Sequence, residues 1–307
     1  MPLELTISSP LAETQLKLQA LRTRLRSLRR LLVAYSGGVD SALLAWVAHQ
    51  ELGAEMLAVL ADSPSLARSQ RQDAIAFAAE HRIPLLVIET GEMDRPEYRR
   101  NDKARCFHCK DELFTVMQSY ARQHGFGAIA YGMNVDDQGD YRPGQAAAHQ
   151  HGVFAPLLDA GLTKDEIRQL ACEAGLRVWD KPASPCLSSR IEYGRPVTRE
   201  ALTAVEQGEE ALHRLGFRQC RARHHGETVR IEVAREDLPR ALAPAMALEF
   251  TRIFKALGFR YVTLDLEGFR SGSLNGFLPA ESLSAKESPS SSLRRGITTE
   301  APETRDS

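Results

Sequence analysis

The sequence predicts an α/β protein in which a doubly wound parallel sheet is followed by a second, smaller α+β domain. In the N-terminal part of the chain, short apolar runs alternate with segments of helical length. Strands that alternate with helices form parallel sheets with helices on both faces. Beyond residue 194 the pattern changes to a helix, two neighbouring strands, further helices and one strand. A chain of 307 residues is long enough to bury a core in each unit.

The first expected element is an amphipathic helix, because Leu18, Leu21, Leu25 and Leu28 recur at helical spacing. Arginines surround this stripe, and the basic face is either solvated or meets an anionic partner. Strands and helices then alternate. We expect strands at 31–35, 55–61, 85–89 and 128–131, and helices at 40–52, 65–81 and 109–124.

The segment that follows the fourth strand, 133–152, is polar and contains glycine, which predicts an irregular insertion. Thr163 and Glu166 have the spacing of a capping box and predict a helix that runs to about residue 174. Residues 179–196 contain prolines and predict a loop. The next elements are expected as a helix at 199–215, strands at 218–223 and 228–233, helices within 236–257 and a strand at 261–266.

Three regions result from this organisation. Residues 1–194 form the first domain, and residues 195–278 form the small α+β domain, for which we expect substrate binding and oligomerisation. The tail at 279–307 is rich in serine, proline and charge, and we expect it to be disordered.

The composition is that of a soluble globular protein, with 43% hydrophobic and 26% charged residues. The formal net charge of -1 shows no basic excess, so we expect no nucleic-acid partner. An apolar run long enough to span a membrane is absent from the sequence, as is the pattern of a signal peptide. We therefore expect a cytoplasmic protein with no membrane partner.

The most specific motif directly follows the first strand and opens a helix. It reads Ser36, Gly37, Gly38, Val39, Asp40 and Ser41, and we refer to it as the SGGVDS loop. Glycines allow a tight turn, and free N–H groups at a helix start favour an anion. The loop is neither a Walker A motif nor the G-x-G-x-x-G of dinucleotide-binding folds.

The SGGVDS loop resembles the signature of the PP-loop ATP pyrophosphatases, whose fold is of the adenine nucleotide α-hydrolase type. The resemblance implies that the loop binds the pyrophosphate of ATP with Mg²⁺, and that Asp40 lies on the metal side. Ser63 follows the second strand and Gly132 the fourth, where such sheets place nucleotide contacts. A glycine at 132 would let an adenine lie against the backbone, although a surface turn is an equal alternative.

Five cysteines offer further chemistry, and Cys106 and Cys109 form a CxxC pair. This pair is a redox centre, half a zinc site, part of an iron–sulfur site, or two small buried side chains. Cys186 is the natural third ligand, because it lies in a loop. Cys172 and Cys220 fit a helical and a strand pattern and are expected to be structural.

Together, the SGGVDS loop, residues 105–110 and residues 181–191 resemble one family over roughly residues 15–276. This is the ATP-dependent sulfur transferase family that helps to build the nickel-pincer nucleotide cofactor of lactate racemase, the LarE family. Residues 221–226 and 265–273 add to the resemblance. It implies that a carboxylate of a pyridinium dicarboxylate mononucleotide attacks ATP, that pyrophosphate leaves, and that sulfur then displaces AMP to form a thiocarboxylate.

Within that resemblance, Cys186 matches the sulfur-bearing position and is the expected catalytic residue. Some members have only this cysteine and sacrifice its sulfur. The presence of Cys106 and Cys109 departs from that pattern and resembles members in which three cysteines hold a [4Fe-4S] cluster. The expected metal ligands are therefore Cys106, Cys109 and Cys186. Members of the family assemble as oligomers, so we expect a homo-oligomer that acts on a small nucleotide substrate.

Arginines of the matching motifs are candidates for binding the phosphate and carboxylates of the substrate, because a guanidinium forks onto both groups. These are Arg190, Arg221 and Arg223, whereas Glu209 and Glu232 are weaker candidates for contacts with substrate or metal. Three other function classes stay open. A tRNA thiolase would need a basic RNA-binding surface, an amidating synthetase would not need the three cysteines, and a non-enzymatic iron–sulfur or zinc carrier would release no pyrophosphate.

Overall fold

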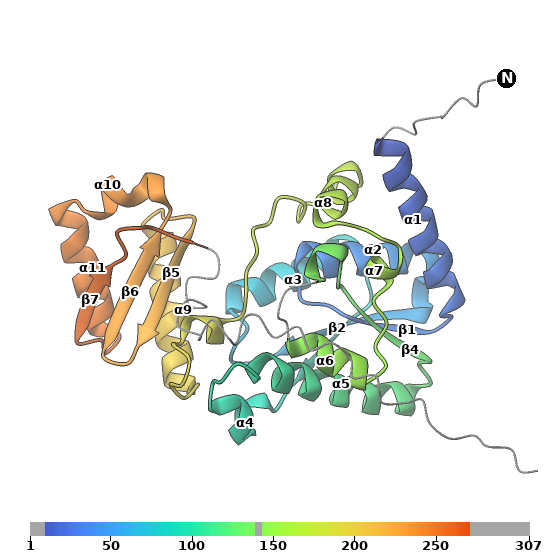
Figure 1. Cartoon of the computed structure of the whole chain (residues 1–307), viewed down its shortest axis with the longest axis horizontal. Helices are drawn as coiled ribbons and strands as arrows, with labels where there is room; N and C mark the ends of the chain where they lie inside the picture. Colours follow the sequence, from blue (N-terminus) through green and yellow to red (C-terminus); the bar gives the residue numbers. More distant parts are fainter. Residues whose placement is uncertain (1–9, 139–142, 271–307) are drawn as a thin grey trace, which may run out of the picture.

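The computed structural model of the chain describes residues 10–138 and 143–270. Its larger sheet has four parallel strands in the order β3-β2-β1-β4 (Figure 1). The strands are β1 (Leu31–Ala34), β2 (Met56–Asp62), β3 (Leu85–Glu89) and β4 (Ala128–Tyr131). This confirms the predicted α/β class with a parallel sheet.

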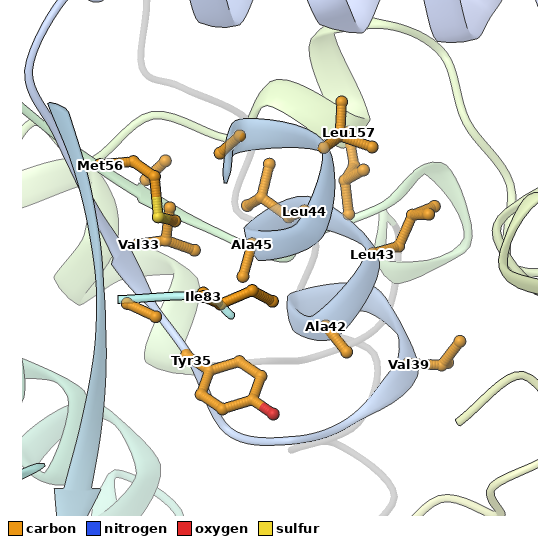
Figure 2. Close-up of a cluster of buried hydrophobic side chains, with 14 of the residues drawn as sticks. Val33, Tyr35, Val39, Ala42, Leu43, Leu44, Ala45, Met56, Ile83 and Leu157 are labelled. Atoms are coloured by element: carbon orange, nitrogen blue, oxygen red, sulfur yellow. The ribbon is translucent and has the colours of Figure 1, made fainter. Parts of the chain in front are cut away.

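Each strand of this sheet contributes to two cores, because successive side chains point to opposite faces. The helices beside this sheet are α1 (Pro10–Ser27), α2 (Val39–Leu52), α3 (Arg68–Glu80), α5 (Arg105–His124), α6 (Pro143–Gln150), α7 (Pro156–Asp159) and α8 (Lys164–Glu173). Leu31 and Val33 pack with α1, α2, α3 and α8, whereas Leu32 and Ala34 pack with α5 and α6. Figure 2 shows the first of these cores, in which Leu44 and Ala45 of α2 cluster with Val33 and Met56 of the sheet.

The strand order reverses between β1 and β4. Strands β2 and β3 are added on one side of β1, and the chain then returns to place β4 on the other side. In open parallel sheets, ligands bind outside the carboxyl ends of the strands at such a reversal. The SGGVDS loop follows β1 and Gly132 follows β4, so both motifs lie at this position.

The second sheet has three strands in the order β5-β6-β7, with β5 and β6 antiparallel and β6 and β7 parallel. It is formed by β5 (Cys220–His225), β6 (Thr228–Val233) and β7 (Tyr261–Leu264), and is accompanied by α9 (Arg199–Arg214), α10 (Leu238–Ala241) and α11 (Pro244–Ala256). Figure 1 shows this unit beside the larger sheet, with α9 on the side that faces it. The two sheets lie on either side of Gly194 in sequence, and the domain boundary itself stays a prediction.

A small apolar cluster joins the two units. It combines Tyr98 of α4 (Pro96–Arg99), Leu187 and Ile191 with Leu202 and Val205 of α9. Tyr98 is 1% exposed, so the contact is closely packed. The segment that carries Cys186 therefore lies between the two sheets.

Two expectations about secondary structure are wrong. The helix expected from Cys109 begins at Arg105, which places both cysteines of the CxxC pair on its first turns. The segment expected to be irregular contains η3 (Val135–Asp137) and α6. Its alanines explain α6, because alanine has the highest helix propensity and Ala147 and Ala148 are buried against α5. The predicted disordered tail lies outside the described residues.

Helices of this protein are too short or too polar to cross a membrane, as far as residues 10–138 and 143–270 are concerned.

Gly132 is required by packing between β4 and α2. A Cβ atom there would lie 2.8 Å from the Ser41 nitrogen and 3.1 Å from the Asp40 carbonyl carbon, both of which are backbone atoms. Backbone atoms cannot turn aside as a side chain can. Packing against the backbone of α2 therefore explains why residue 132 is a glycine, independently of any contact with adenine.

We expect Gly132→Ala to lower the free energy of unfolding by about 1–3 kcal/mol, because the added methyl group overpacks against backbone. Gly127→Ala is the matched control, since Gly127 lies just before the same strand and a Cβ there meets nothing within 4 Å. Urea unfolding of both variants measures the difference. Equal stability of the two variants would contradict this reading of Gly132.

Candidate functional site

The SGGVDS loop turns tightly from β1 into α2. Gly37 has a φ of +73°, in the left-handed region, and a Cβ there would lie 2.6 Å from Cβ of Ala74 in α3. Gly38 is the N-cap residue of α2, and no side chain caps this helix start. The first N–H groups of a helix without a cap can bind an anion, and the helix dipole favours that binding. The loop therefore has the geometry of an anion site.

Two serines brace this loop. The Ser41 hydroxyl donates to the carbonyl of Gly38 at 3.1 Å and accepts the N–H of Ser36 at 3.2 Å. The two hydroxyl oxygens lie 3.1 Å apart. Ser41 is 5% exposed, whereas Ser36 is exposed. Ser41 thus holds the turn, and Ser36 is the hydroxyl that a ligand can reach.

Both carboxylate oxygens of Asp40 are engaged by other side chains. Its Oδ1 accepts from the amide of Asn134 at 3.1 Å, and its Oδ2 accepts from Nζ of Lys164 at 2.5 Å. Asn134 is 2% exposed and caps η3 just beyond Gly132. Oxygen donors of this kind fit Mg²⁺, which proteins bind through one or two carboxylates together with substrate phosphates. Asp40 can fill that role once Lys164 moves away.

Lysines reach the loop from two distant segments. Lys164 is the first residue of α8, and Lys181 donates to the carbonyl of Gly37 at 3.4 Å. The sequence did not single out either lysine as a site residue. The capping box located the start of α8, but only the fold brings that start beside α2.

Ser63 lies at the same edge of the sheet and is 7% exposed. Its hydroxyl accepts the N–H of Ser65 at 3.1 Å, and the two hydroxyl oxygens are 2.7 Å apart. Ser63 thus lies at the edge of the sheet where nucleotide contacts are expected. Its hydrogen bonds to Ser65, however, are local and are those of a turn. Its role in cofactor binding stays a prediction.

Arg190 holds the backbone around Cys186. The side chain is 1% exposed and forks onto Glu209 of α9, at 2.9 Å and 3.1 Å. Its Nη1 also donates to the carbonyls of Pro185 and Cys186, at 2.5 Å and 3.1 Å. Arg190 is therefore fully bonded to protein, and in this arrangement its guanidinium is not open to a substrate.

Arg221 and Arg223 bond the same segment from β5. Arg221 donates to the carbonyl of Ala183 at 3.3 Å, and Arg223 donates to the carbonyl of Ser189 at 3.2 Å. Arg223 is paired with the buried Glu232 at 2.9 Å. All three predicted substrate arginines thus contact residues 183–190, the stretch that carries Cys186. Whether they also bind substrate stays a prediction.

The other side of this segment is held by α4 and α5. The buried Arg105, which precedes Cys106, donates to the carbonyl of Ser188 at 2.8 Å. The hydroxyl oxygens of Tyr98 and Ser188 lie 2.6 Å apart. These contacts connect the Cys186 segment to the helix that carries the CxxC pair.

The predicted metal ligands Cys106, Cys109 and Cys186 interact electrostatically. Burial, and then the nearby charge of Cys186, raise the pKa of the Cys109 thiol to about 12, whereas Cys106 is exposed. Soft thiols suit an iron–sulfur cluster, which binds them as thiolates. Among the described residues, however, no group of three or more His, Cys, Asp or Glu side chains is arranged to hold a metal ion. A [4Fe-4S] cluster on Cys106, Cys109 and Cys186 stays a prediction.

Comparison with known proteins gives relatives that match most of the chain and others that match about half of it. An uncharacterised protein of Synechocystis is 43% identical over 262 residues, which are 85% of this chain and 98% of the relative. The pyridinium-3,5-bisthiocarboxylic acid mononucleotide synthase of Lactiplantibacillus plantarum is 34% identical over 258 residues, 83% of this chain and 92% of the relative. One component of the glutamine-hydrolysing GMP synthase of Methanococcus vannielii is 27% identical over 165 residues, 48% of this chain and 51% of the relative. No family model matches the chain.

We expect Arg190→Lys to speed alkylation of Cys186 by about tenfold, because hydrogen bonds from a charged donor contribute about 1.5–3 kcal/mol each and lysine cannot fork. Mass spectrometry of the peptide that contains Cys186 gives the rate. Arg195→Lys is the control, since Arg195 pairs with Glu192 at the surface, just beyond the stretch that carries Cys186. An unchanged rate at Cys186 in Arg190→Lys would show that Arg190 does not anchor the loop.

Proposed function

Because the chain belongs to the family of the pyridinium-3,5-bisthiocarboxylic acid mononucleotide synthases, we propose that it is an ATP-dependent sulfur transferase of nickel-pincer cofactor biosynthesis. Its substrate is the pyridinium-3,5-biscarboxylic acid mononucleotide, and its products are the thiocarboxylate, AMP and pyrophosphate.

One observation supports the proposal most directly: the segment from Lys181 to Leu187 connects the two halves of the chemistry. At one end Lys181 donates to the carbonyl of Gly37 in the SGGVDS loop. At the other end the N–H of Leu187 donates to the carbonyl of Ser65 at 2.8 Å. Five residues span at most about 17–18 Å, so Cys186 lies within that distance of the lysine at the anion site.

The first half of the reaction makes the carboxylate reactive. A carboxylate oxygen of the substrate attacks the α-phosphorus of ATP, pyrophosphate leaves, and an acyl adenylate forms. The α2 start and the lysines at the SGGVDS loop supply the positive potential that stabilises the leaving pyrophosphate. Mg²⁺, held by Asp40 and the phosphates, would neutralise further charge.

The second half transfers sulfur. Attack of a sulfur nucleophile at the acyl carbon expels AMP, which is a good leaving group. If Cys186 is the donor, its Cβ–Sγ bond then breaks with loss of the α-proton, so that a thiocarboxylate and a dehydroalanine remain. A [4Fe-4S] cluster on the three cysteines would instead supply a sulfide and spare Cys186.

Other functions for this fold predict different behaviour. An amidating synthetase, the class to which the GMP synthase relative belongs by its name, would need ammonia and not Cys186. A tRNA thiolase would require RNA as acceptor. A carrier that only binds nucleotide would release no pyrophosphate with any acid.

We expect Cys186→Ser to retain release of pyrophosphate from ATP and the biscarboxylic acid mononucleotide, but to form no thiocarboxylate. Cys172→Ser is the control, because Cys172 is an exposed cysteine of α8 and lies outside the proposed site. Pyrophosphate release and product mass are the two measurements. Thiocarboxylate formation by Cys186→Ser would contradict the proposal.

The source of the sulfur is decided by analysis of protein purified without oxygen. Iron and sulfide in the ratio of a [4Fe-4S] cluster, lost in Cys106→Ala, would support a catalytic sulfur carrier. An iron-free protein that loses the mass of H₂S after one turnover would support a sacrificial Cys186, with the CxxC pair structural.

A further inference from the structure

We propose that Lys164 is a movable counter-ion of the SGGVDS loop. Without nucleotide it neutralises Asp40, and it moves onto the pyrophosphate part of the nucleotide when a divalent cation takes its place at that carboxylate. The inference rests on the proposed nucleotide chemistry and adds a residue to it. It requires nothing from the sulfur transfer.

The contacts of Asp40 separate a fixed partner from a movable one. The amide of Asn134 is buried and is held by the capping box of η3, in which its side chain accepts the N–H groups of Asp136 and Asp137. Nζ of Lys164, 2.5 Å from Oδ2 of Asp40, is at the end of a flexible four-carbon side chain. Only the lysine can leave without disturbing the fold around Asp40.

The backbone of Lys164 is anchored even though its side chain is not. Its N–H donates to a carboxylate oxygen of Asp136 at 2.6 Å. Thr163 and Glu166 form a capping box at the same helix start. The ammonium group can therefore change position by rotation of its side chain, while the backbone of Lys164 stays in place and keeps it beside the start of α2.

The pair itself is suited to exchange. The side chains of Lys164 and Asp40 are 33% and 20% exposed, and ion pairs with such access to water are weak. Mg²⁺ has twice the charge of an ammonium group and prefers carboxylate and phosphate oxygens. In the described part of the chain, no set of three acidic, histidine or cysteine side chains forms a metal site. A divalent cation thus needs nucleotide phosphates as ligands to displace Lys164.

This exchange has two consequences for the reaction. Without nucleotide, Lys164 keeps divalent cations from Asp40. With nucleotide, the displaced ammonium group adds a positive charge beside the pyrophosphate that leaves.

Lys164→Met tests the inference, because it removes the charge and keeps most of the side chain. Without nucleotide, binding of Mn²⁺ measured by electron paramagnetic resonance should tighten by about fivefold, since Asp40 loses its counter-ion. Binding of pyrophosphate with Mn²⁺, measured by calorimetry, should weaken by about tenfold, since a charge-assisted contact is lost. Lys164→Arg should keep wild-type exclusion of Mn²⁺ in the absence of nucleotide.

The control is Lys17→Met. Lys17 forms a pair of similar length and exposure with Glu166 of the same helix, at 2.7 Å, but does not reach the loop. It should change neither affinity.

Opposite changes in the two affinities are the expected signature, and a purely structural lysine would not produce them. An unchanged or weaker affinity for Mn²⁺ in Lys164→Met, or a loss of both affinities together, would overturn the inference. Wild-type protein that binds no pyrophosphate would overturn the proposed function itself. Failure to form thiocarboxylate, with the opposite changes present, would leave Lys164 as proposed.

Discussion

Two buried arginine side chains, each paired with a glutamate, connect the polypeptide segments at the site where the two sheets meet. Burial of a guanidinium is costly unless a carboxylate and further acceptors compensate it. Arg190 and Arg223 are paired with Glu209 and Glu232, and each arginine also donates to a backbone carbonyl near Cys186. The segment that carries Cys186 is thereby positioned by two buried guanidinium groups that are held in place by their carboxylate partners.

This arrangement connects the smaller sheet to the segment that carries Cys186. Glu209 also accepts the N–H of Ala222 in β5, at 3.2 Å, so a single carboxylate links α9, β5 and the Cys186 segment. The apolar cluster around Tyr98 supports the same junction from the side of α4. Residues of both sheets thus position Cys186, whereas the SGGVDS loop lies at the edge of the larger sheet.

The fold was largely predictable from sequence, because short apolar runs mark the strands and segments of helical length mark most helices. The failure at α6 has a local cause: its polar flanks concealed a run of alanines, of which Ala147 and Ala148 pack on α5. At the site, the SGGVDS loop was predictable because its residues are contiguous. The partners of Asp40 were not, since Asn134 and Lys164 are 94 and 124 residues away in sequence. The role of Arg190 as a backbone anchor also escaped prediction, because a motif shows the type of side chain but not its partners.

The strand order has a consequence for how the chain is made. Leu31 of β1 pairs with Met56 on one side but with Ala128 on the other, so β1 gains its second neighbour only after β2, β3 and α5 have been made. Until β4 has emerged from the ribosome and paired, Gly132 and Asn134 cannot close against the start of α2. Segments that follow later still bring Lys164, Lys181 and Cys186. A nascent or prematurely ended chain can therefore pair β1 with β2 and β3 before the surroundings of Asp40, and later those of Cys186, are in place.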